Sequence, residues 1–294
     1  MNLPKINVLI VGANGRLGTL VTKECLQYEN INVNVIVRDR SKNQEVIKEV
    51  EQRKGKVYEF DFSQPELLTE FTKDIHTIVS CLCGPDTYES QRKLLEYGSK
   101  NGVKRFLPSE YSCVEFPQVK EEGENDIIKK VKEFCKELEK SQVKSLHFYN
   151  GIFTEWFFDQ DPVHYYGTGK EELPFTSYRD TAKYVAAAIS DPERSGEVRI
   201  IVENLTMEQV EDICQKETGN KLNIVRGNFE EGNQRIKQLI DEKKNMDAFI
   251  LELVLLWAQG KGPSKSDNTQ FPNVKPDFLV TDYFKSKKEK QVMH

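Results

Sequence analysis

Three side chains that can exchange or accept protons follow one apolar segment of the chain. Residues 103–107 read as a strand, and Pro108, Ser109, Glu110 and Tyr111 come directly after it. In a sheet of parallel strands this position lies at the carboxyl edge, where ligands bind. The segment therefore predicts either a catalytic group in which Tyr111 donates a proton, or a turn with no chemical role.

A glycine-rich segment, VGANGRLG at residues 11–18, follows the first predicted strand and opens a predicted helix. Its glycines permit a tight turn and a close approach of the backbone, and the amino end of the helix stabilises a pyrophosphate. This context favours dinucleotide binding over a purely structural turn. The residues predicted to contact the dinucleotide here are Gly12, Asn14, Gly15, Arg16, Leu17 and Gly18.

The choice between NAD and NADP is made where the second predicted strand ends. That strand runs into Arg38, whereas proteins that select NAD usually present a carboxylate to the ribose hydroxyls at this point. A planar guanidinium binds a 2′-phosphate and stacks on adenine, and Arg16 is a second arginine for this role. Asp39 is a competing signal, and a solvated charge is the alternative for Arg38. We predict NADP(H) as the cofactor.

Three later strand ends supply further candidate cofactor contacts. Asp61 and Phe62, after the third strand, form a polar and apolar pair for adenine, although Asp61 also suits the cap of a turn. Ser80 and Cys81 end the fourth strand, where small residues let the backbone approach the cofactor. Pro108 follows the fifth strand, beside the expected position of the nicotinamide.

Short β-branched segments alternate with segments of helical length up to about residue 150. This alternation predicts an α/β fold of the Rossmann type, a doubly wound parallel sheet with a smaller C-terminal substrate lobe. We place an NAD(P)-binding Rossmann domain at residues 1–150 and a substrate-binding lobe at 151–294, with the chain crossing back to the core. The predicted strands span residues 6–11, 33–37, 56–60, 77–82, 103–107 and 143–148.

The second half of the chain is less regular. Residues 165–170, YYGTGK, predict a hairpin turn because of their two glycines. Residues 177–190 predict a helix entered at Asp180, and residues 207–219 predict a helix closed by Gly219. These elements would belong to the substrate lobe.

Composition argues against several partners and compartments. The 294 residues include 42 basic and 47 acidic ones, a net charge of −5, so no nucleic-acid partner is expected. The longest apolar run, residues 248–258, contains Glu252 and is well short of the roughly 20 residues that span a bilayer. No signal segment opens the sequence, and the six cysteines form no disulfide framework or metal motif. We therefore expect a cytoplasmic protein without a metal site.

Taken in order, the motifs resemble one known family. VGANGRLG, IVRDRSK, FDFSQPELL, KRFLPSEYS and SYRDTAKYVAAAI are similar to the NmrA-like, isoflavone-reductase-like group of atypical short-chain dehydrogenases. FPNVKPDFLVTDYF resembles the closing segment of that group. The resemblance implies NADPH binding and reduction of a small aromatic or quinone-like substrate. It also implies that Asn150 and Phe153, in HFYNGIF, face the nicotinamide.

The usual catalytic pair of short-chain dehydrogenases is missing. That chemistry needs a lysine four residues after a tyrosine on one helix face, but Glu115 holds this position relative to Tyr111. Tyr166 and Lys170 have the spacing, but the glycines between them argue against a helix. The catalytic lysine, if present, must come from elsewhere.

The resemblance implies a lysine at the start of the helix that follows the Pro-Ser-Glu segment. Val131 and Cys135 align with the buried positions of that helix. This alignment puts Ile128 at the expected lysine, and Lys129 lies one residue away. Because one residue turns a helical side chain by about 100°, Lys129 is either the catalytic lysine or a solvated charge. We carry Lys129 and Tyr111 forward as candidate catalytic residues.

Two functions stay open from the sequence. The first is an NADPH-dependent oxidoreductase that transfers hydride to a small apolar carbonyl, enone or quinone-like substrate. The alternative is a non-catalytic, NADP(H)-binding redox-sensing regulator of the NmrA type, which acts through a protein partner. The aromatic cluster Phe153, Trp156, Phe157 and Phe158 lines an apolar substrate pocket under the first function, and the same residues suit a hydrophobic core.

Overall fold

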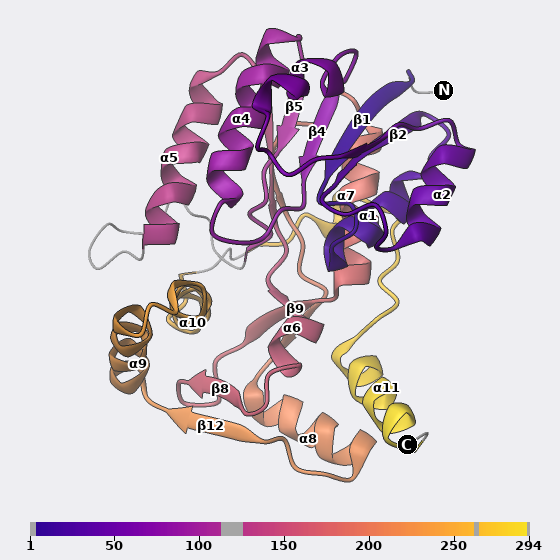
Figure 1. The fold of residues 1–294 in the computed structure, drawn as a ribbon. Helices are drawn as coiled ribbons and strands as arrows, with labels where there is room; N and C mark the ends of the chain where they lie inside the picture. The colour runs from indigo at the N-terminus through magenta and orange to yellow at the C-terminus, as the bar shows by residue number, and fades with distance from the viewer. Residues whose placement is uncertain (1–3, 113–125, 262–264, 293–294) are drawn as a thin grey trace. The chain divides into compact units, whose positions relative to one another are not determined.

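The computed structural model describes residues 4–112, 126–261 and 265–292 and contains two compact units (Figure 1). Each unit is assembled from three separate stretches of the chain. The first unit comprises Met1–Glu110, Lys130–Phe148 and Ala182–Val198. The second unit comprises Tyr111–Lys129, Tyr149–Thr181 and Arg199–His294.

A seven-stranded sheet with the strand order β10-β6-β5-β4-β1-β2-β3 forms the centre of the first unit. β1 pairs in parallel with β2 and β4, and the pairs β2–β3, β4–β5 and β5–β6 are also parallel. All six predicted strands lie in this sheet, which confirms the Rossmann-type α/β fold. The strands are β1 (Ile6–Val11), β2 (Ile31–Val37), β3 (Val57–Glu59), β4 (Thr77–Ser80), β5 (Arg105–Leu107), β6 (Lys144–Tyr149) and β10 (Gly196–Arg199).

The central strands are apolar and β-branched because helices cover both faces of a parallel sheet. β4 is buried along its whole length, as are the last four residues of β1. On one flank α4 and α5 lie side by side (Figure 1), and Arg92 of α4 donates to Glu137 of α5 over 2.9 and 3.0 Å. The helices are α1 (Arg16–Cys25), α2 (Gln44–Gln52), α3 (Leu68–Phe71), α4 (Thr87–Lys100), α5 (Asp126–Lys140) and α7 (Tyr178–Ser190).

A buried arginine anchors the third stretch of the first unit to the sheet. Arg105 in β5 is 1% exposed, and burial lowers its pKa to about 10. Its guanidinium donates to the main-chain oxygens of Ile189, Asp191 and Arg194 and to Thr77 Oγ1. The carbonyl of Ile189 lies in the last turn of α7, where carbonyls lack intrahelical partners, and Asp191 and Arg194 follow that helix. A single boundary at residue 150 therefore does not describe the division of the chain.

Two small sheets, with the orders β11-β9-β7 and β12-β8, lie in the second unit. β8 and β9 are consecutive in the chain but belong to different sheets, so the hairpin predicted for residues 165–170 is wrong. Glu171 folds this segment by accepting bonds from the backbone N–H groups of Thr168 and Gly169 and from the Tyr165 hydroxyl. The strands are β7 (Ile152–Phe153), β8 (Val163–Tyr166), β9 (Leu173–Thr176), β11 (Glu203–Leu205) and β12 (Ile224–Gly227).

The helices expected after residue 150 are present. α7 begins at Tyr178, two residues after β9, and Gly219 ends α8 with φ +78°, a left-handed conformation that favours glycine. In the described parts of the chain, no helix has both the length and the apolar character needed to cross a membrane. The remaining helices are α6 (Thr154–Phe158), α8 (Met207–Thr218), α9 (Phe229–Asp241), α10 (Asn245–Ala258) and α11 (Val280–Val292).

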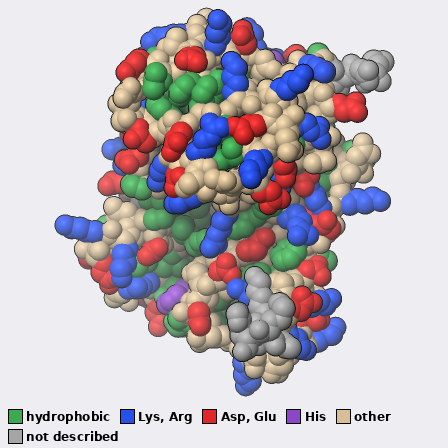
Figure 2. All heavy atoms as spheres, turned by 45° about the vertical axis from the view of Figure 1, so that its right-hand side comes forward, with side chains coloured by type: hydrophobic (Ala, Val, Ile, Leu, Met, Phe, Trp, Pro, Cys, Tyr) green, Lys and Arg blue, Asp and Glu red, His purple; other side chains and the backbone are tan. Residues whose placement is uncertain are grey.

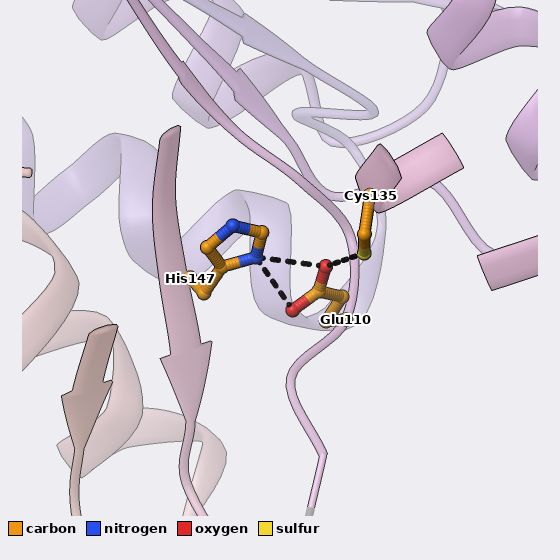
Figure 3. A group of neighbouring side chains, drawn as sticks. All are labelled: Glu110, Cys135 and His147. Carbon is orange, nitrogen blue, oxygen red and sulfur yellow. Dashed lines mark hydrogen bonds and ion pairs between the residues drawn. The ribbon is translucent and has the colours of Figure 1, made fainter. Parts of the chain in front are cut away.

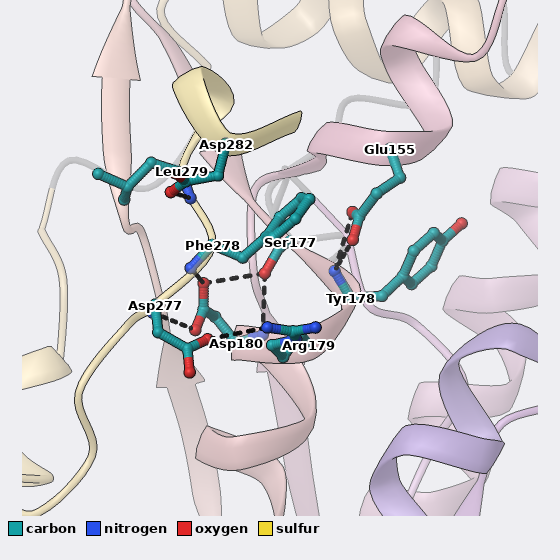
Figure 4. Close-up of polar contacts among 9 residues, drawn as sticks. All are labelled: Glu155, Ser177, Tyr178, Arg179, Asp180, Asp277, Phe278, Leu279 and Asp282. Carbon is teal, nitrogen blue, oxygen red and sulfur yellow. Dashed lines mark hydrogen bonds and ion pairs between the residues drawn. The ribbon is translucent and has the colours of Figure 1, made fainter. Parts of the chain in front are cut away.

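Asp180 ties the closing segment of the chain to the start of α7 (Figure 4). Its buried carboxylate accepts hydrogen bonds from the backbone N–H groups of Asp277, at 2.9 Å, and Phe278, at 3.2 Å. It also accepts from the hydroxyl of Ser177 at 2.9 Å, and the N–H of Asp180 donates back to that hydroxyl oxygen. The Ser177 hydroxyl thus caps the start of α7, and the buried Asp180 carboxylate anchors the closing segment to it within the second unit.

Candidate functional site

The glycine-rich segment forms a tight turn between β1 and α1. Gly12 has φ +83°, and the N–H of Gly15 donates to its carbonyl oxygen at 3.0 Å. A Cβ at Gly18 would lie 2.1 Å from that same oxygen, so α1 packs directly on the turn. Gly15 is the N-cap residue and provides no side-chain cap. The first N–H groups of α1 therefore keep their capacity to bind an anion.

Two exposed arginines flank this turn, Arg16 at the start of α1 and Arg38 directly after β2. The competing carboxylate of Asp39 is held locally, because its Oδ1 accepts from the hydroxyl of Ser41 at 2.6 Å and from its N–H at 2.9 Å. These bonds lower the pKa of Asp39. Asn14 Nδ2 donates to the main-chain oxygen of Asp39 at 3.0 Å, which joins the end of β2 to the glycine turn.

Asp61 and Phe62 both follow β3. Asp61 is exposed, and its Oδ1 accepts from the N–H of Ser63 at 2.9 Å. It therefore caps a turn, which was the alternative to adenine contact in the sequence analysis. Phe62 is half-buried with φ +69°, and its ring centroid lies 4.8 Å from that of Phe60. The contact of Asp61 and Phe62 with adenine stays a prediction.

The ends of β4 and β5 bring small and buried residues to the same edge of the sheet. Ser80 is completely buried, and its hydroxyl has no hydrogen-bond partner among the described residues. The N–H of Cys81 donates to the carbonyl of Val11 at 2.8 Å, which sets this strand end against the glycine turn. Pro108 is buried, and Ser109 Oγ donates to the carbonyl of Leu82 at 2.5 Å.

Asn150 and Phe153 lie in the second unit. Asn150 is completely buried, and neither its Nδ2 nor its Oδ1 has a partner among the described residues. A buried amide without partners costs free energy unless water or a ligand satisfies it. The ring of Phe153 stacks on that of Tyr178, with centroids 4.1 Å apart. A bound ring with a polar substituent could form the hydrogen bonds that the Asn150 amide lacks.

Glu110 belongs to a cluster that the sequence did not predict (Figure 3). Its carboxylate accepts from Nδ1 of His147 at 3.0 and 3.1 Å and from Sγ of Cys135 at 2.9 Å. The side chain of Glu110 is 0% exposed and that of His147 is 8% exposed. Because the three residues come from the segment after β5, from α5 and from β6, no local spacing in the sequence reveals the group.

Burial and the charge of Glu110 set the protonation of its two neighbours. Burial raises the pKa of the Cys135 thiol, and the nearby carboxylate raises it further. Burial lowers the pKa of His147, but the hydrogen bond and charge of Glu110 outweigh that effect and leave the pKa raised. The thiol is therefore protonated at neutral pH when the three side chains are the whole group.

The two candidate catalytic residues differ in exposure. Tyr111 is 9% exposed and has φ +35°, an uncommon conformation for a residue with a side chain. Lys129 is exposed on α5, whereas Ile128 and Val131 on the same helix are completely buried. The position that the family resemblance assigns to a lysine is thus held by buried Ile128. Catalytic roles for Lys129 and Tyr111 stay predictions.

The aromatic cluster after β7 serves both a pocket and the core of the second unit. Trp156 and Phe157 line a pocket of about 250 Å³. Phe158 instead packs against Phe175, at 5.2 Å between ring centroids, and against the aromatic rings of α11. The other residues that line the pocket are Gln160, His164, Arg235, Leu239, Asp247, Ile250, Leu251 and Val254.

Figure 2 shows one face of the molecule, on which Lys and Arg side chains are interspersed with Asp and Glu side chains. The net charge of the whole sequence is −5. Among the described residues on that face, the charges are mixed rather than gathered by sign. Such a surface is not typical of nucleic-acid binding, which needs clustered positive charge.

The sheet order and the glycine turn between β1 and α1 define a Rossmann-type α/β protein. A sequence profile of the NmrA-like family matches residues 4–256. The chain belongs to the NmrA-like family, and the resemblance found from the motifs is confirmed.

Two named relatives are oxidoreductases by their descriptions. Oxidoreductase BOA1 of Botryotinia fuckeliana is 26% identical over 200 residues, which cover 60% of this chain and 66% of that protein. Pinoresinol reductase 1 of Arabidopsis thaliana is 26% identical over 249 residues, which cover 74% of this chain and 76% of that protein. The chain therefore spans just under two thirds of the first relative and about three quarters of the second.

Solved structures with this fold include complexes with NADP(H). The binary complex of leucoanthocyanidin reductase with NADPH from Vitis vinifera has a TM-score of 0.79 and 19% identity, covering 96% of this chain and 99% of that one. AtPrR2 with NADP+ and (+)pinoresinol has a TM-score of 0.78 and 21% identity, covering 96% and 98%. These similarities show a shared fold across nearly the whole chain.

Proposed function

We propose that this protein is an NADPH-dependent oxidoreductase that reduces a small apolar carbonyl, enone or quinone-like substrate. The bound cofactor supplies the hydride, and the chain supplies binding, orientation and proton transfer. Membership of the NmrA-like family and the reductase names of the relatives support an oxidoreductase. The observation that carries the choice of cofactor is the end of β2.

At the end of β2, the residues suit a 2′-phosphate. Arg38 is exposed there, while Oδ1 of the neighbouring Asp39 accepts two hydrogen bonds from Ser41. The glycine turn leaves no room for a Cβ at Gly18 and leaves the amino end of α1 for the pyrophosphate. The buried, unsatisfied amide of Asn150 suits the carboxamide of a nicotinamide.

The pocket at Trp156 and Phe157 is our candidate for the substrate-binding cavity. A volume of about 250 Å³ suits a single aromatic or quinone-like ring, and the lining combines apolar side chains with polar ones such as His164. Nδ1 of His164 is buried in this region without a hydrogen-bond partner among the described residues. We therefore expect a preferred substrate with an apolar ring and one polar substituent that can bond to His164.

Loss of NADPH absorbance with a panel of quinones, enones and aromatic carbonyls tests the proposed activity. We expect turnover with at least one member, and NADPH at equal concentration should support a higher rate than NADH. Tight NADPH binding without turnover across the panel would contradict the enzyme and favour the regulator. The regulator is supported by one observation: Lys129, a candidate catalytic residue, is exposed and lies away from the buried face of α5.

Replacing Arg38 by alanine should change the choice of cofactor. A hydrogen bond to a charged group contributes about 1.5–3 kcal/mol, so the Kd of NADPH should rise by about 10- to 100-fold. The Kd of NADH should change little, because NADH has no 2′-phosphate. Titration of cofactor fluorescence measures both constants.

Arg40→Ala is the matched control, because Arg40 is exposed two residues later and pairs with Glu51. This variant should leave both constants near those of the unchanged protein. Equal weakening of NADPH and NADH by Arg38→Ala would remove the phosphate role of Arg38.

Tyr111 is the stronger of our two candidate proton donors, because it is buried and has a strained backbone conformation. Tyr111→Phe removes only the hydroxyl and should lower kcat by about 100-fold, the usual contribution of general acid catalysis, with the Kd of NADPH unchanged. Lys129→Ala is compared with Lys130→Ala, its exposed neighbour on α5. A kcat that falls with Lys129→Ala and not with Tyr111→Phe would assign proton donation to the lysine instead.

A further inference from the structure

We propose that Glu110, Cys135 and His147 form a binding site for a divalent zinc ion in the first unit. Their ligand atoms, a carboxylate oxygen, Sγ and Nδ1, all lie within 4.8 Å of one another. Nitrogen, sulfur and carboxylate oxygen are the ligands that zinc takes in proteins, at about 2.0–2.3 Å. The proposal stands on this group alone and does not depend on the proposed reductase activity.

Two of the three distances within the cluster are slightly shorter than those of a tetrahedral zinc site. With the usual bond lengths and tetrahedral angles, zinc ligands lie about 3.3 Å apart for nitrogen and oxygen and about 3.5 Å apart for sulfur and oxygen. Here Nδ1 of His147 lies 3.0 Å from the nearer oxygen of Glu110, and Sγ of Cys135 lies 2.9 Å from it. To admit the ion, these two contacts must open by about 0.3 and 0.6 Å. Sγ of Cys135 and Nδ1 of His147, which lie within 4.8 Å of each other, must come to about 3.6 Å apart.

A helix and a strand present two of the three ligands, and hydrogen bonds hold the loop that carries the third. Glu110 follows Ser109, whose N–H donates to Gln91 Oε1 at 2.7 Å and whose hydroxyl donates to the carbonyl of Leu82 at 2.5 Å. Cys135 lies within the 15-residue helix α5, and His147 lies in β6, which pairs with β5. Because helices and strands hold ligands more closely than loops do, little order must be imposed when the ion binds.

The charges of the cluster suit a buried dication. A carboxylate that is 0% exposed is costly unless it is neutralised. Zinc bound by the Glu110 carboxylate, the Cys135 thiolate and neutral His147 would carry no net charge. Binding releases the thiol proton, and any proton on Nδ1, to the solvent. Three protein ligands leave a fourth position for water, the arrangement of open zinc sites.

Cobalt(II) substitution tests the site directly, because a thiolate bound to cobalt gives a near-ultraviolet charge-transfer band together with visible bands of tetrahedral geometry. We expect metal-free protein to take up one equivalent of Co²⁺ with both signals, and Zn²⁺ to displace it. Zn²⁺ should also raise the unfolding temperature. Loss of a residue that only hydrogen-bonds to a metal ligand weakens metal affinity by about 10- to 100-fold. Loss of a ligand itself should cost more, so Cys135→Ser and His147→Gln should each weaken Zn²⁺ affinity by at least about 100-fold.

Cys214→Ser is the control, because Cys214 is a buried thiol in the second unit. It should leave the cobalt bands and Zn²⁺ affinity unchanged. The proposal is overturned if unchanged protein shows no thiolate-to-cobalt band, if Zn²⁺ does not stabilise it, or if the band survives in Cys135→Ser. Circular dichroism of each variant separates the loss of a ligand from the loss of the fold.

Discussion

Gly18→Ala should raise the Kd of NADPH by about 100-fold and lower the unfolding temperature. The new Cβ would lie 2.1 Å from the carbonyl oxygen of Gly12 and 3.0 Å from Cα of Ala13. These are backbone atoms, so neither can rotate away as a side chain would. Overpacking typically costs about 1–3 kcal/mol, and the upper end of that range corresponds to about 100-fold in affinity.

Gly15→Ala is the matched control in the same turn. Its Cβ would lie 3.2 Å from the same oxygen of Gly12, a contact that a small shift relieves. We expect a smaller rise in the Kd of NADPH and a smaller fall in the unfolding temperature than for Gly18→Ala, because the new contact is 3.2 Å rather than 2.1 Å. Isothermal titration and thermal unfolding of both variants give the comparison. Equal effects would show that close packing at Gly18 does not shape the binding turn.

Asp180→Ala should lower the free energy of unfolding by about 3 kcal/mol, the second large effect. The substitution removes the acceptor of the N–H groups of Asp277 and Phe278 and also the partner of the Ser177 hydroxyl. Each unsatisfied buried donor costs about 1–3 kcal/mol, and partial access of water limits the sum. Urea unfolding measures the loss. Hydrogen exchange should show it first in residues 271–284 and at the start of α7.

Asp282→Ala is the control for this effect, because Asp282 accepts one bond, from the N–H of Leu279 at 3.0 Å, in a more exposed setting. It should cost only about 1 kcal/mol. Asp180→Asn keeps the size of the side chain and tests the role of charge, and we expect it to fall between the two alanine variants. A loss from Asp180→Ala no larger than that from Asp282→Ala would show that the closing segment is held by its apolar contacts instead.

Local pattern predicted the sheet well, because most of its strands are short apolar runs that alternate with segments of helical length. β10 escaped prediction because Gly196–Arg199 has two exposed residues of its four and acquires strand structure only beside β6. The hairpin predicted at residues 165–170 was wrong because strand pairing also depends on partners that the local sequence does not show. Two glycines do indicate a turn, but β8 pairs with β12, and β9 pairs with β11 and β7, rather than with each other.

In the candidate site too, features that depend on consecutive residues were predictable, and features that join distant residues were not. The glycine turn and Arg38 were predictable because each depends on a few consecutive residues next to a strand. The cluster at Glu110 was not, because Cys135 and His147 lie 25 and 37 residues later. Likewise, only the structure reveals that Oδ1 of Asp39 accepts two hydrogen bonds from Ser41.

Residues 182–198 belong to the first unit, and this limits where the chain can be shortened without disrupting that unit. A shortened chain that stops at residue 150 would lack β10 and leave the long edge of β6 with unpaired backbone groups, a surface that recruits other strands. It would also remove the three carbonyls that accept hydrogen bonds from the guanidinium of Arg105. Residues 1–150 therefore do not form a separable unit. A chimera that exchanges the first unit between relatives must also exchange residues 182–198.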